Sequence, residues 1–413
     1  MRLLLIVFFV PIITFSQTIL YTMPSEDSAH EGTWLQWPHD YTYGSGWQSE
    51  NEGAFVDMVA ALSTGENVHI IVYNASEQSH VQQLFVNANC CFTNVDFYVH
   101  PNDDFWVRDN GPIFVYDNNN ELAIIDFGFN GWGDDAPYSL CDQIPSLIAT
   151  DLNIPVVDVS DFVLEGGAIE IDGNGTAMMT RSSITASDRN PNLTEGQIED
   201  YMTTYLGITN FIWLDGMFGG TQDITDQHID GFARFVDSNT IVTMNNSDLW
   251  YWYVSTSDIS TLNSATDVNG NSYSIVHLPL TQNNIFTTSG INTQSKGSYV
   301  NYYVANDVVL VPTYNDANDS TALALIQGLY PNKTAVGIDC RNIFNYGGMV
   351  HCVTQQQPIN LNITSIIESN YSSKKVIKVV DVLGRKMNSK DNQILIYIFD
   401  DGTVGKQLII NNE

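Results

Sequence analysis

The chain reads DDFWVRDNGPIFV over residues 103–115, a polar centre that leads directly into an apolar, strand-forming run. Four later stretches share this design of a polar centre beside strand-forming residues, and their centres are Glu165, His228, Asn301 and Cys352. Counted from Asp109 through those four positions, the gaps are 56, 63, 73 and 51 residues. Similar supersecondary units of this length, arranged in a ring, would bring their polar centres together.

The segments between these centres predict both strands and helices. Short apolar or alternating runs predict strands at residues 67–73, 112–117, 122–127, 240–245, 273–280 and 308–312. Amphipathic spacing predicts helices at residues 53–63, 194–207 and 319–331. Because the two kinds of segment alternate, we expect an α/β fold.

The two ends of the chain differ in composition from the middle. Residues 1–16 have one Arg, an apolar run and then small polar residues, which is typical of a secretory signal peptide. We expect one large domain over residues 17–358 and a linker over residues 359–373. Residues 374–413 contain three strand-like runs and predict a small β-rich appendage.

The chain is strongly acidic, which limits its partners. It carries 47 Asp and Glu against 15 Lys and Arg, a formal net charge of −32. Seven of the basic residues follow Tyr371, so the main domain is more acidic still. Such a field repels nucleic acid and anionic lipid and attracts small cations, so we expect no nucleic-acid partner.

The chain has five cysteines, an odd number that leaves at least one thiol unpaired. None forms a CxxC pair, which argues against a zinc site. Cys90 and Cys91 are adjacent and would bridge each other only with strain, whereas either could reach Cys141 or Cys340. The sequence leaves that pairing open.

Cys352 follows the pair Gly347–Gly348, and glycines allow a close approach of the backbone. It is either a nucleophile or a buried structural thiol. The adjacent His351 would point to the opposite face of a strand, so we expect it not to act on the thiol. His228 and Asp230 are two residues apart and would point from the same face of a strand. They could serve as a base and as an anchor for a cation, or they could form an exposed polar strand end.

Two further acids are site candidates. Asp109 lies beside Arg108 and close to Trp106, which fits either a surface ion pair or a carboxylate offered to a cationic ligand. Glu165 precedes Gly166–Gly167, which fits either a β-bulge with an exposed acid or a site carboxylate.

Taken together, the candidates comprise a thiol, a histidine and three carboxylates. Three carboxylates do not suit a cysteine protease, because they raise the free energy of forming a thiolate and an oxyanion. Carboxylates suit an electrophile that is itself a cation, and a planar guanidinium matches them with paired hydrogen bonds. Thiolate attack on its carbon, protonation of the departing ammonia and attack by water amount to hydrolytic deimination.

Eight stretches in order, across Met23 to Pro358, resemble the agmatine deiminase family, which includes the secreted bacterial peptidyl-arginine deiminases. They are EGTWLQWPHD, FWVRDNGPIFV, FGFNGWG, LEGGAIEIDGNGTAMMT, RNPNLT, HIDGFARFV, YNDANDS and GGMVHCVTQQQP. The resemblance implies a five-bladed, pseudo-symmetric α/β propeller of the guanidine-modifying type, with the site on its axis. It implies no cofactor and no metal.

The resemblance also implies roles for individual residues. Cys352 would be the nucleophile and His228 the general acid and then base. Asp109 and Asp230 would hold the guanidinium, and Glu165 would orient or charge-balance His228. Two further residues would line the pocket, namely Trp106 and Asn301.

The substrate stays open between two members of the class. The resemblance implies arginines in the stretch 126–137 for a secreted peptidyl-arginine deiminase, but this stretch contains none and offers Asp134 and Asp135. This favours dicationic agmatine, giving N-carbamoylputrescine, a putrescine precursor, and ammonia. The signal peptide favours a secreted peptidyl-arginine deiminase that forms citrulline. The rivals are an amidinotransferase, which needs an amine acceptor, and a non-catalytic acidic surface-binding protein.

The tail has a resemblance of its own. KVVDVLGRKMNSK and ILIYIFDDGTVGKQLII resemble the C-terminal sorting domains of the type IX secretion route of Bacteroidetes. This implies the secretion machinery as a partner and a secreted or cell-surface location. The sequence leaves the oligomeric state open, a homo-oligomer included.

Overall fold

The computed structural model describes residues 18–90, 93–217, 223–361, 376–380, 393–399 and 404–409. The chain divides into two compact units, residues 1–359 and 360–413. The predicted signal peptide, Cys91 and most of the predicted linker lie outside the described residues, and the domain boundaries stay predictions.

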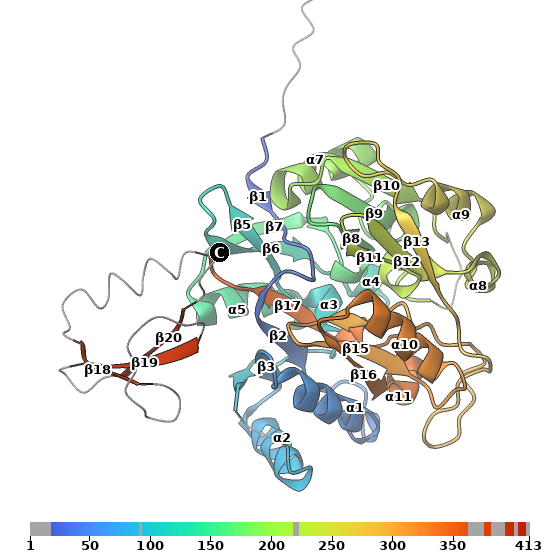
Figure 1. Ribbon diagram of the computed structural model, residues 1–413. Helices are drawn as coiled ribbons and strands as arrows, with labels where there is room; N and C mark the ends of the chain where they lie inside the picture. Colours follow the sequence, from blue (N-terminus) through green and yellow to red (C-terminus); the bar gives the residue numbers. More distant parts are fainter. Residues whose placement is uncertain are drawn as a thin grey trace, which may run out of the picture. The chain divides into compact units, whose positions relative to one another are not determined.

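The described part of the first unit contains five mixed sheets that share one pattern (Figure 1). In each sheet two strands pair antiparallel, and one of them also pairs parallel with a third. The simplest case is β8 (Ile169–Ile171), β9 (Thr176–Thr180) and β10 (Asn210–Leu214), in which α7 (Glu195–Leu206) connects the two parallel strands. A parallel pair requires such a crossover, usually a helix.

Of the other four sheets, two repeat this three-stranded unit and two add one strand to it. The order in one sheet is β1 (Tyr21–Thr22), β5 (Ile113–Asp117), β6 (Leu122–Gly128) and β7 (Val156–Val163). Another sheet joins β11 (Ala233–Asp237), β12 (Thr240–Met244) and β13 (Ser274–Leu278). A third joins β14 (Tyr303–Val304), β15 (Val308–Thr313) and β16 (Thr334–Asp339). The last links the two ends of the unit, in the order β17 (Gln355–Pro358), β2 (His30–Gln36), β3 (Asn67–Val72) and β4 (Val95–Val99).

Helices connect the parallel strands of each sheet and lie toward the outside of the unit (Figure 1). The longer ones are α1 (Trp47–Leu62), α2 (Ala75–Asn87), α5 (Ile144–Leu152), α9 (Thr256–Asn263) and α10 (Asp319–Leu329). Shorter ones are α4 (Gly131–Asp134), η1 (Cys141–Gln143), α6 (Arg181–Ile184), α8 (Asn246–Tyr251) and α11 (Arg341–Asn345). The α/β class and the predicted strands and helices at the positions given above are confirmed.

The ends of α7 show why the sequence predicted this helix well. The Thr194 side chain accepts from the backbone of Gln197, whose side chain accepts in return from Thr194, a capping box. Gly207 ends the helix with φ 76°, a left-handed conformation that favours glycine. Such a cap stabilises a helix end by about 1 kcal/mol and depends only on local sequence.

The polar centres are not on strands, which corrects one expectation from the sequence. Asp109 and Cys352 lie on single helical turns, α3 (Val107–Asn110) and η4 (His351–Val353). Glu165 and His228 directly precede the turns η2 (Gly166–Ala168) and η3 (Ile229–Gly231). Asn301 lies in irregular chain just before β14. The next strand after each centre pairs antiparallel with a strand that also has a parallel partner, so the five predicted centres occupy equivalent positions in five similar units.

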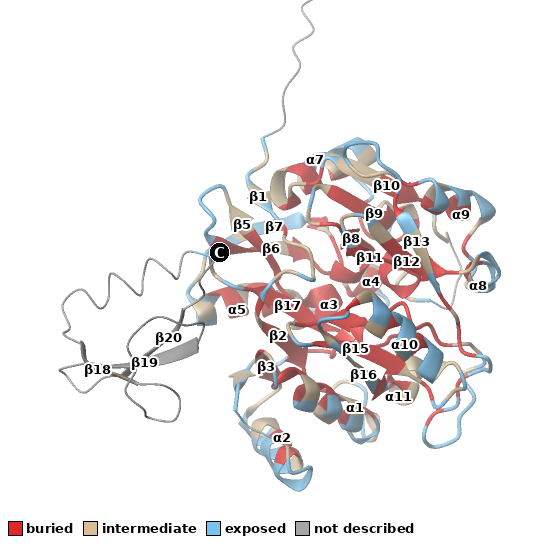
Figure 2. Ribbon diagram, viewed as in Figure 1, coloured by how far each residue is buried: buried red, intermediate tan, exposed pale blue. Residues whose placement is uncertain are grey.

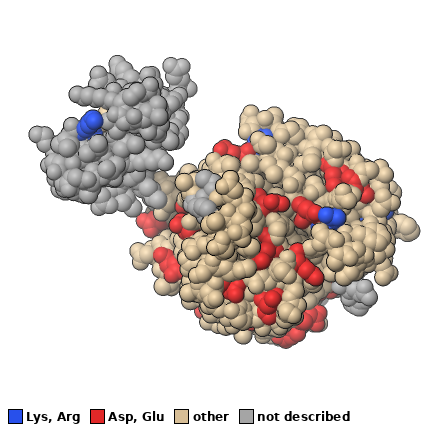
Figure 3. Space-filling model, turned by 90° about the horizontal axis from the view of Figure 1, so that it is seen from below, with Lys and Arg blue, Asp and Glu red and all other residues tan. Residues whose placement is uncertain are grey.

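The strands supply most of the hydrophobic core, and their residues are largely buried in Figure 2. The largest cluster combines the buried face of α1 with strand residues of four sheets and reaches Val353, beside the polar turns. Among the described residues, no helix is long and apolar enough to cross a membrane. Over the face of the first unit seen in Figure 3, acidic side chains far outnumber basic ones.

The second unit contains an antiparallel sheet among its described residues. Its order is β18 (Val376–Val380), β19 (Gln393–Phe399) and β20 (Val404–Ile409). The three strand-like runs predicted in the tail are therefore strands. Its resemblance to a sorting domain stays a prediction.

Candidate active site

The polar turns pack against one another, α3 against η2 and η4, and η2 against η3. Gly167 lies at their meeting point. A Cβ atom on Gly167 would be 2.7 Å from His228 Nδ1, 2.8 Å from Asp109 Oδ1 and 3.2 Å from Asp230 Oδ2. Only glycine leaves these three side chains room to converge. The structure thus brings together polar residues that the sequence spreads over more than a hundred positions.

Cys352 lies at the edge of this cluster, on η4. Its Sγ atom is 3.5 Å from Asn301 Oδ1 and 3.9 Å from Asp230 Oδ2. Burial raises the pKa of the Cys352 thiol well above its usual value, and the charges of Asp230 and Asp109 raise it further. Without a ligand, this cysteine is therefore a protonated thiol.

His228 is held by a carboxylate that is itself held by an arginine. His228 Nε2 lies 2.8 Å from Glu165 Oε2, and Nδ1 lies 3.6 Å from Asp109 Oδ1. On its other oxygen Glu165 accepts a 2.8 Å hydrogen bond from Nε of Arg189, and both side chains are fully buried. Burial alone would lower the pKa of His228, but Asp109 and Glu165 outweigh it and raise that pKa to about 9. The ring is therefore an imidazolium at neutral pH.

Asp109 accepts two hydrogen bonds that fix its direction. Trp132 Nε1 donates to Oδ2 at 3.0 Å, and the backbone N–H of Gly167 donates to Oδ1 at 3.1 Å. Burial raises the pKa of Asp109 to about 6, although the nearby His228 lowers it in part. The Asp109 carboxyl group is thus held in one orientation, but too little positive charge surrounds it to keep its pKa low. A cationic ligand would supply that charge.

Trp106 forms a wall beside the cysteine. A Cβ atom on Gly348 would lie 2.2 Å from the Trp106 ring and 3.1 Å from Cys352 Cβ. The glycine before Cys352 is thus required by the indole ring, which sits almost against the backbone there. The expectation that Trp106 lines a pocket stays a prediction.

His351 hydrogen-bonds to two carboxylates, and no hydrogen bond joins it to the Cys352 thiol among the described residues. It lies on the short helix η4 and not on a strand. Its Nδ1 is 2.7 Å from Asp230 Oδ2, and its Nε2 is 2.7 Å from Glu26 Oε2. Burial would raise the pKa of Asp230, but the hydrogen bond and charge of His351 outweigh it and lower that pKa. Asp230 is therefore the carboxylate that stays charged.

Sequence reasoning assigned no role to three residues that support the site. Trp132 and Arg189 lay inside two of the family-like stretches, FGFNGWG and RNPNLT, but nothing local indicated their partners. Glu26 lies 325 positions from His351 and only the fold joins them. Arg108 does not pair with Asp109 at the surface; it is buried, and its guanidinium faces Glu26 and Gln356.

Two further cysteines, Cys141 and Cys340, lie outside the polar turns. Cys141 and Cys340 are buried free thiols, so neither forms the disulfide that the sequence left open. Asp134 and Asp135, which favoured a dicationic substrate, are exposed just after Trp132. Among the described residues, no group of three or more His, Cys, Asp or Glu could hold a metal ion.

Arg189→Met is expected to lower the free energy of unfolding by about 3–5 kcal/mol, because it removes one of the two cationic groups that contact the buried Glu165. The control is Arg181→Met, whose pairs with Glu195 and Asp215 are partly exposed and contribute under about 1 kcal/mol. Chemical denaturation of both variants measures the difference. Equal losses would show that the Glu165–Arg189 pair does not stabilise the site.

Three carboxylates around one thiol suit an electrophile that carries positive charge, the property that distinguishes guanidine-modifying hydrolases from cysteine proteases. Residues 22–358 match the family model of the Porphyromonas-type peptidyl-arginine deiminases. The chain belongs to this family, as its resemblance predicted.

Proteins of the same kind are found among curated relatives and solved structures. A putative agmatine deiminase of Selenomonas ruminantium is 30% identical over 82% of this chain and 96% of its own. The agmatine deiminase of Medicago truncatula is 31% identical, with the same coverage. The structure of agmatine deiminase from Enterococcus faecalis matches with a TM-score of 0.73 and 26% identity, over 83% of this chain and 96% of that one. A putative arginine deiminase from Porphyromonas gingivalis matches with a TM-score of 0.70 and 30% identity, over 82% and 98%.

Proposed function

We propose that the protein hydrolyses agmatine to N-carbamoylputrescine and ammonia. The observation that carries this proposal is the convergence of Asp109, Asp230 and His228 around Gly167, with the Cys352 thiol 3.9 Å from Asp230. The relatives named agmatine deiminase, which match most of this chain, support it.

The substrate guanidinium would bind between Asp109 and Asp230, with its carbon facing Cys352. Each carboxylate can accept hydrogen bonds from a guanidinium edge, and the two fix the plane of the group. Trp106 would close one side of the pocket and offers a ring face to the cation. No cofactor is needed for this binding.

Substrate binding would activate the thiol. In the empty site the charges of Asp230 and Asp109 oppose thiolate formation. A bound guanidinium offsets those charges and adds a cation next to Sγ, which lowers the pKa of the thiol. The nucleophile would thus be formed only when the substrate is present, which protects it from oxidation and side reactions.

The chemistry would then proceed in two halves. The thiolate attacks the guanidinium carbon, and the His228 imidazolium gives a proton to the departing nitrogen, so that ammonia leaves and a covalent thiouronium remains. The neutral His228 next takes a proton from water, which attacks the same carbon. Collapse of this second adduct expels the Cys352 thiolate and releases the ureido product.

The rival substrate is a peptidyl arginine. The matched family model and the exported character expected from residues 1–16 favour it. The exposed Asp134 and Asp135 near the site favour agmatine, since they would attract its second cation and repel a carboxylate. We give agmatine more weight because of these two charges and the named relatives.

A competition among substrates tests the choice. The full chain is incubated with agmatine, free arginine and a peptide ending in arginine, and kcat/KM is measured from ammonia release. Agmatine is expected to exceed both others by at least about 100-fold, a difference of about 2.7 kcal/mol in transition-state binding. Faster turnover of the peptide would reverse the assignment.

Glu165→Gln is expected to move the alkaline limb of the kcat/KM profile to lower pH. His228 must be protonated to release ammonia, and its raised pKa of about 9 keeps it so through neutral pH. Removing the Glu165 charge lowers that pKa, so the ratio of activity at pH 9 to that at pH 7 should fall at least about threefold. An unchanged limb would exclude His228 as the acid.

We further propose that the five sheets surround one axis as a five-bladed propeller, with the polar turns at its centre. The equivalent place of each polar centre, just before the antiparallel strand of its unit, supports this. We also propose that residues 1–16 direct export and that residues 374–413 engage the secretion machinery, giving a secreted or surface-attached enzyme. Western blotting of culture supernatant and cell surface with and without the tail would test that.

A further inference from the structure

His351 lies in the interior between two carboxylates and connects the candidate site with a second group of charges. Its two ring nitrogens are each 2.7 Å from an oxygen, one of Asp230 and one of Glu26. A neutral imidazole has a single N–H and could donate to only one of these. The ring therefore joins the two carboxylates, one at each nitrogen.

Glu26 is the centre of the second group. The same Oε2 that faces His351 also lies 2.9 Å from Nη2 of Arg234 and 3.3 Å from Nη2 of Arg108, and Oε1 accepts from the backbone N–H of Val304 at 2.8 Å. Burial would raise the pKa of Glu26, but Arg234, His351 and Arg108 outweigh it and hold that pKa well below its usual range. Glu26 is thus a buried, fully partnered carboxylate.

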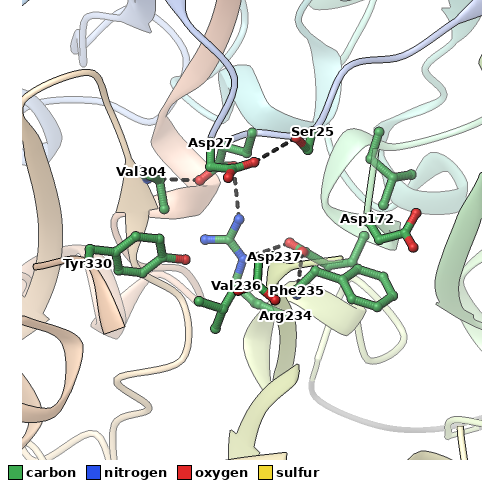
Figure 4. Close-up of a pocket in the computed structure, with 12 residues that line it drawn as sticks. Ser25, Asp27, Asp172, Arg234, Phe235, Val236, Asp237, Val304 and Tyr330 are labelled. Carbon is green, nitrogen blue, oxygen red and sulfur yellow. Dashed lines mark hydrogen bonds and ion pairs between the residues drawn. The ribbon is translucent and has the colours of Figure 1, made fainter. Parts of the chain in front are cut away.

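Arg234 extends this network to a pocket separate from the candidate active site. Its Nε donates to Glu170 at 2.6 Å and its Nη1 to the backbone oxygen of Tyr302. Figure 4 shows the Arg234 guanidinium in the middle of this pocket, facing the segment that carries Ser25 and Asp27, with Tyr330 beside it. Neither Cys352 nor His228 lines the pocket. The pocket therefore marks the far end of the network.

Acidic and basic side chains alternate along the network. Three carboxylates alternate with one histidine and two arginines, all buried or nearly so, namely Asp230, His351, Glu26, Arg108, Arg234 and Glu170. Replacing one charge in such a set leaves another buried without its partner. Removing the charge of Glu26 would therefore alter the hydrogen bonding of His351, and through it the electrostatic environment of Asp230.

We propose that His351 and Glu26 are positioning residues that hold Asp230 ionised and aimed at the substrate cation from the side away from the substrate. The inference rests on the proposed function, because it assigns Asp230 its target. Asp230 needs such support because Asp109 lies close by, and two neighbouring carboxylates otherwise favour sharing a proton. Glu26 comes from the segment before β2, so this early part of the chain would take part in tuning the site.

Two alkylating agents of different charge test the proposal on the full chain. Cys352 is modified with 2-chloroacetamidine, a cation that resembles a guanidinium, and with neutral iodoacetamide, and both rates are measured by peptide mass. In Glu26→Gln the rate with the cation is expected to fall at least about tenfold relative to the rate with the neutral agent. KM for agmatine should rise by a larger factor than kcat falls, because Asp230 binds the ground state.

Three further variants make the result unambiguous. Glu66→Gln removes another buried carboxylate, which accepts from Thr33 and the backbone of Asn306 and does not touch His351, so its rate ratio should stay within about threefold of the wild type. Glu26→Asp keeps the charge and should recover part of the ratio. His351→Gln should show the same fall in the ratio of the two alkylation rates. This variant replaces Glu26→Gln in the test if circular dichroism shows Glu26→Gln to be unfolded.

An unchanged ratio in folded Glu26→Gln or His351→Gln would overturn the proposal and leave the network a structural one. An equal change in Glu66→Gln would overturn it as well. A wild-type enzyme that neither turns over agmatine nor reacts at Cys352 with the cation would instead contradict the proposed function. The two failures are therefore distinguishable.

Discussion

Cys352→Ala is expected to lower kcat for agmatine by at least about 10⁴-fold while the protein stays folded. The covalent route passes through a bond to Sγ, and the described thiols Cys141 and Cys340 are fully buried and lie outside the polar turns. The change removes one atom at a partly exposed position, so unfolding should shift little. Ammonia release and thermal unfolding measure the two effects.

The matched control is Cys340→Ala, which deletes a buried thiol outside the cluster. Its turnover should stay within about threefold of the wild type, at a cost of about 1–2 kcal/mol in stability. Substantial turnover by Cys352→Ala would refute covalent catalysis. A comparable loss in both variants would show that the effect is one of folding.

Asp109→Asn is expected to lower kcat/KM for agmatine by about 10²–10³-fold. The amide keeps the shape of the carboxyl but loses the charge that would face the guanidinium. The same charge does most to raise the pKa of His228 against the effect of burial, so the acid weakens at the same time. Substrate binding and proton transfer should both weaken. Steady-state kinetics separates the two effects as a rise in KM and a fall in kcat.

Asp126→Asn serves as its control, a partly buried aspartate on β6 whose only side-chain partner among the described hydrogen bonds is Ser146. Its kcat/KM should stay within about threefold of the wild type. If Asp109→Asn behaved like this control, Asp109 would not contact the substrate. The guanidinium would then have to bind elsewhere in the cluster.

The sequence predicted regular elements well because their signals are local. Helix α7 has its capping box and final glycine at its own ends, and short apolar runs mark β12 and β15. The same reasoning failed at the polar turns, which were read as strands. Gly166 shows why: a Cβ there would be 2.2 Å from the backbone oxygen of Arg108, a contact made only by the fold.

The candidate site was predictable in its members but not in its connections. Asp109, Glu165, His228, Asp230 and Cys352 were selected by residue type and resemblance, and the structure places them together. The supporting partners could not be found this way. A side chain such as Glu26, joined to His351 across 325 positions, leaves no local pattern in a single sequence.

The identity of the products formed from agmatine tests the central claim most directly. The purified full chain is given agmatine, and the products are separated and quantified by mass spectrometry together with ammonia. We predict equal amounts of N-carbamoylputrescine and ammonia, with the guanidinium carbon kept in the larger product. Release of urea with putrescine, or no reaction at all, would contradict deimination through Cys352.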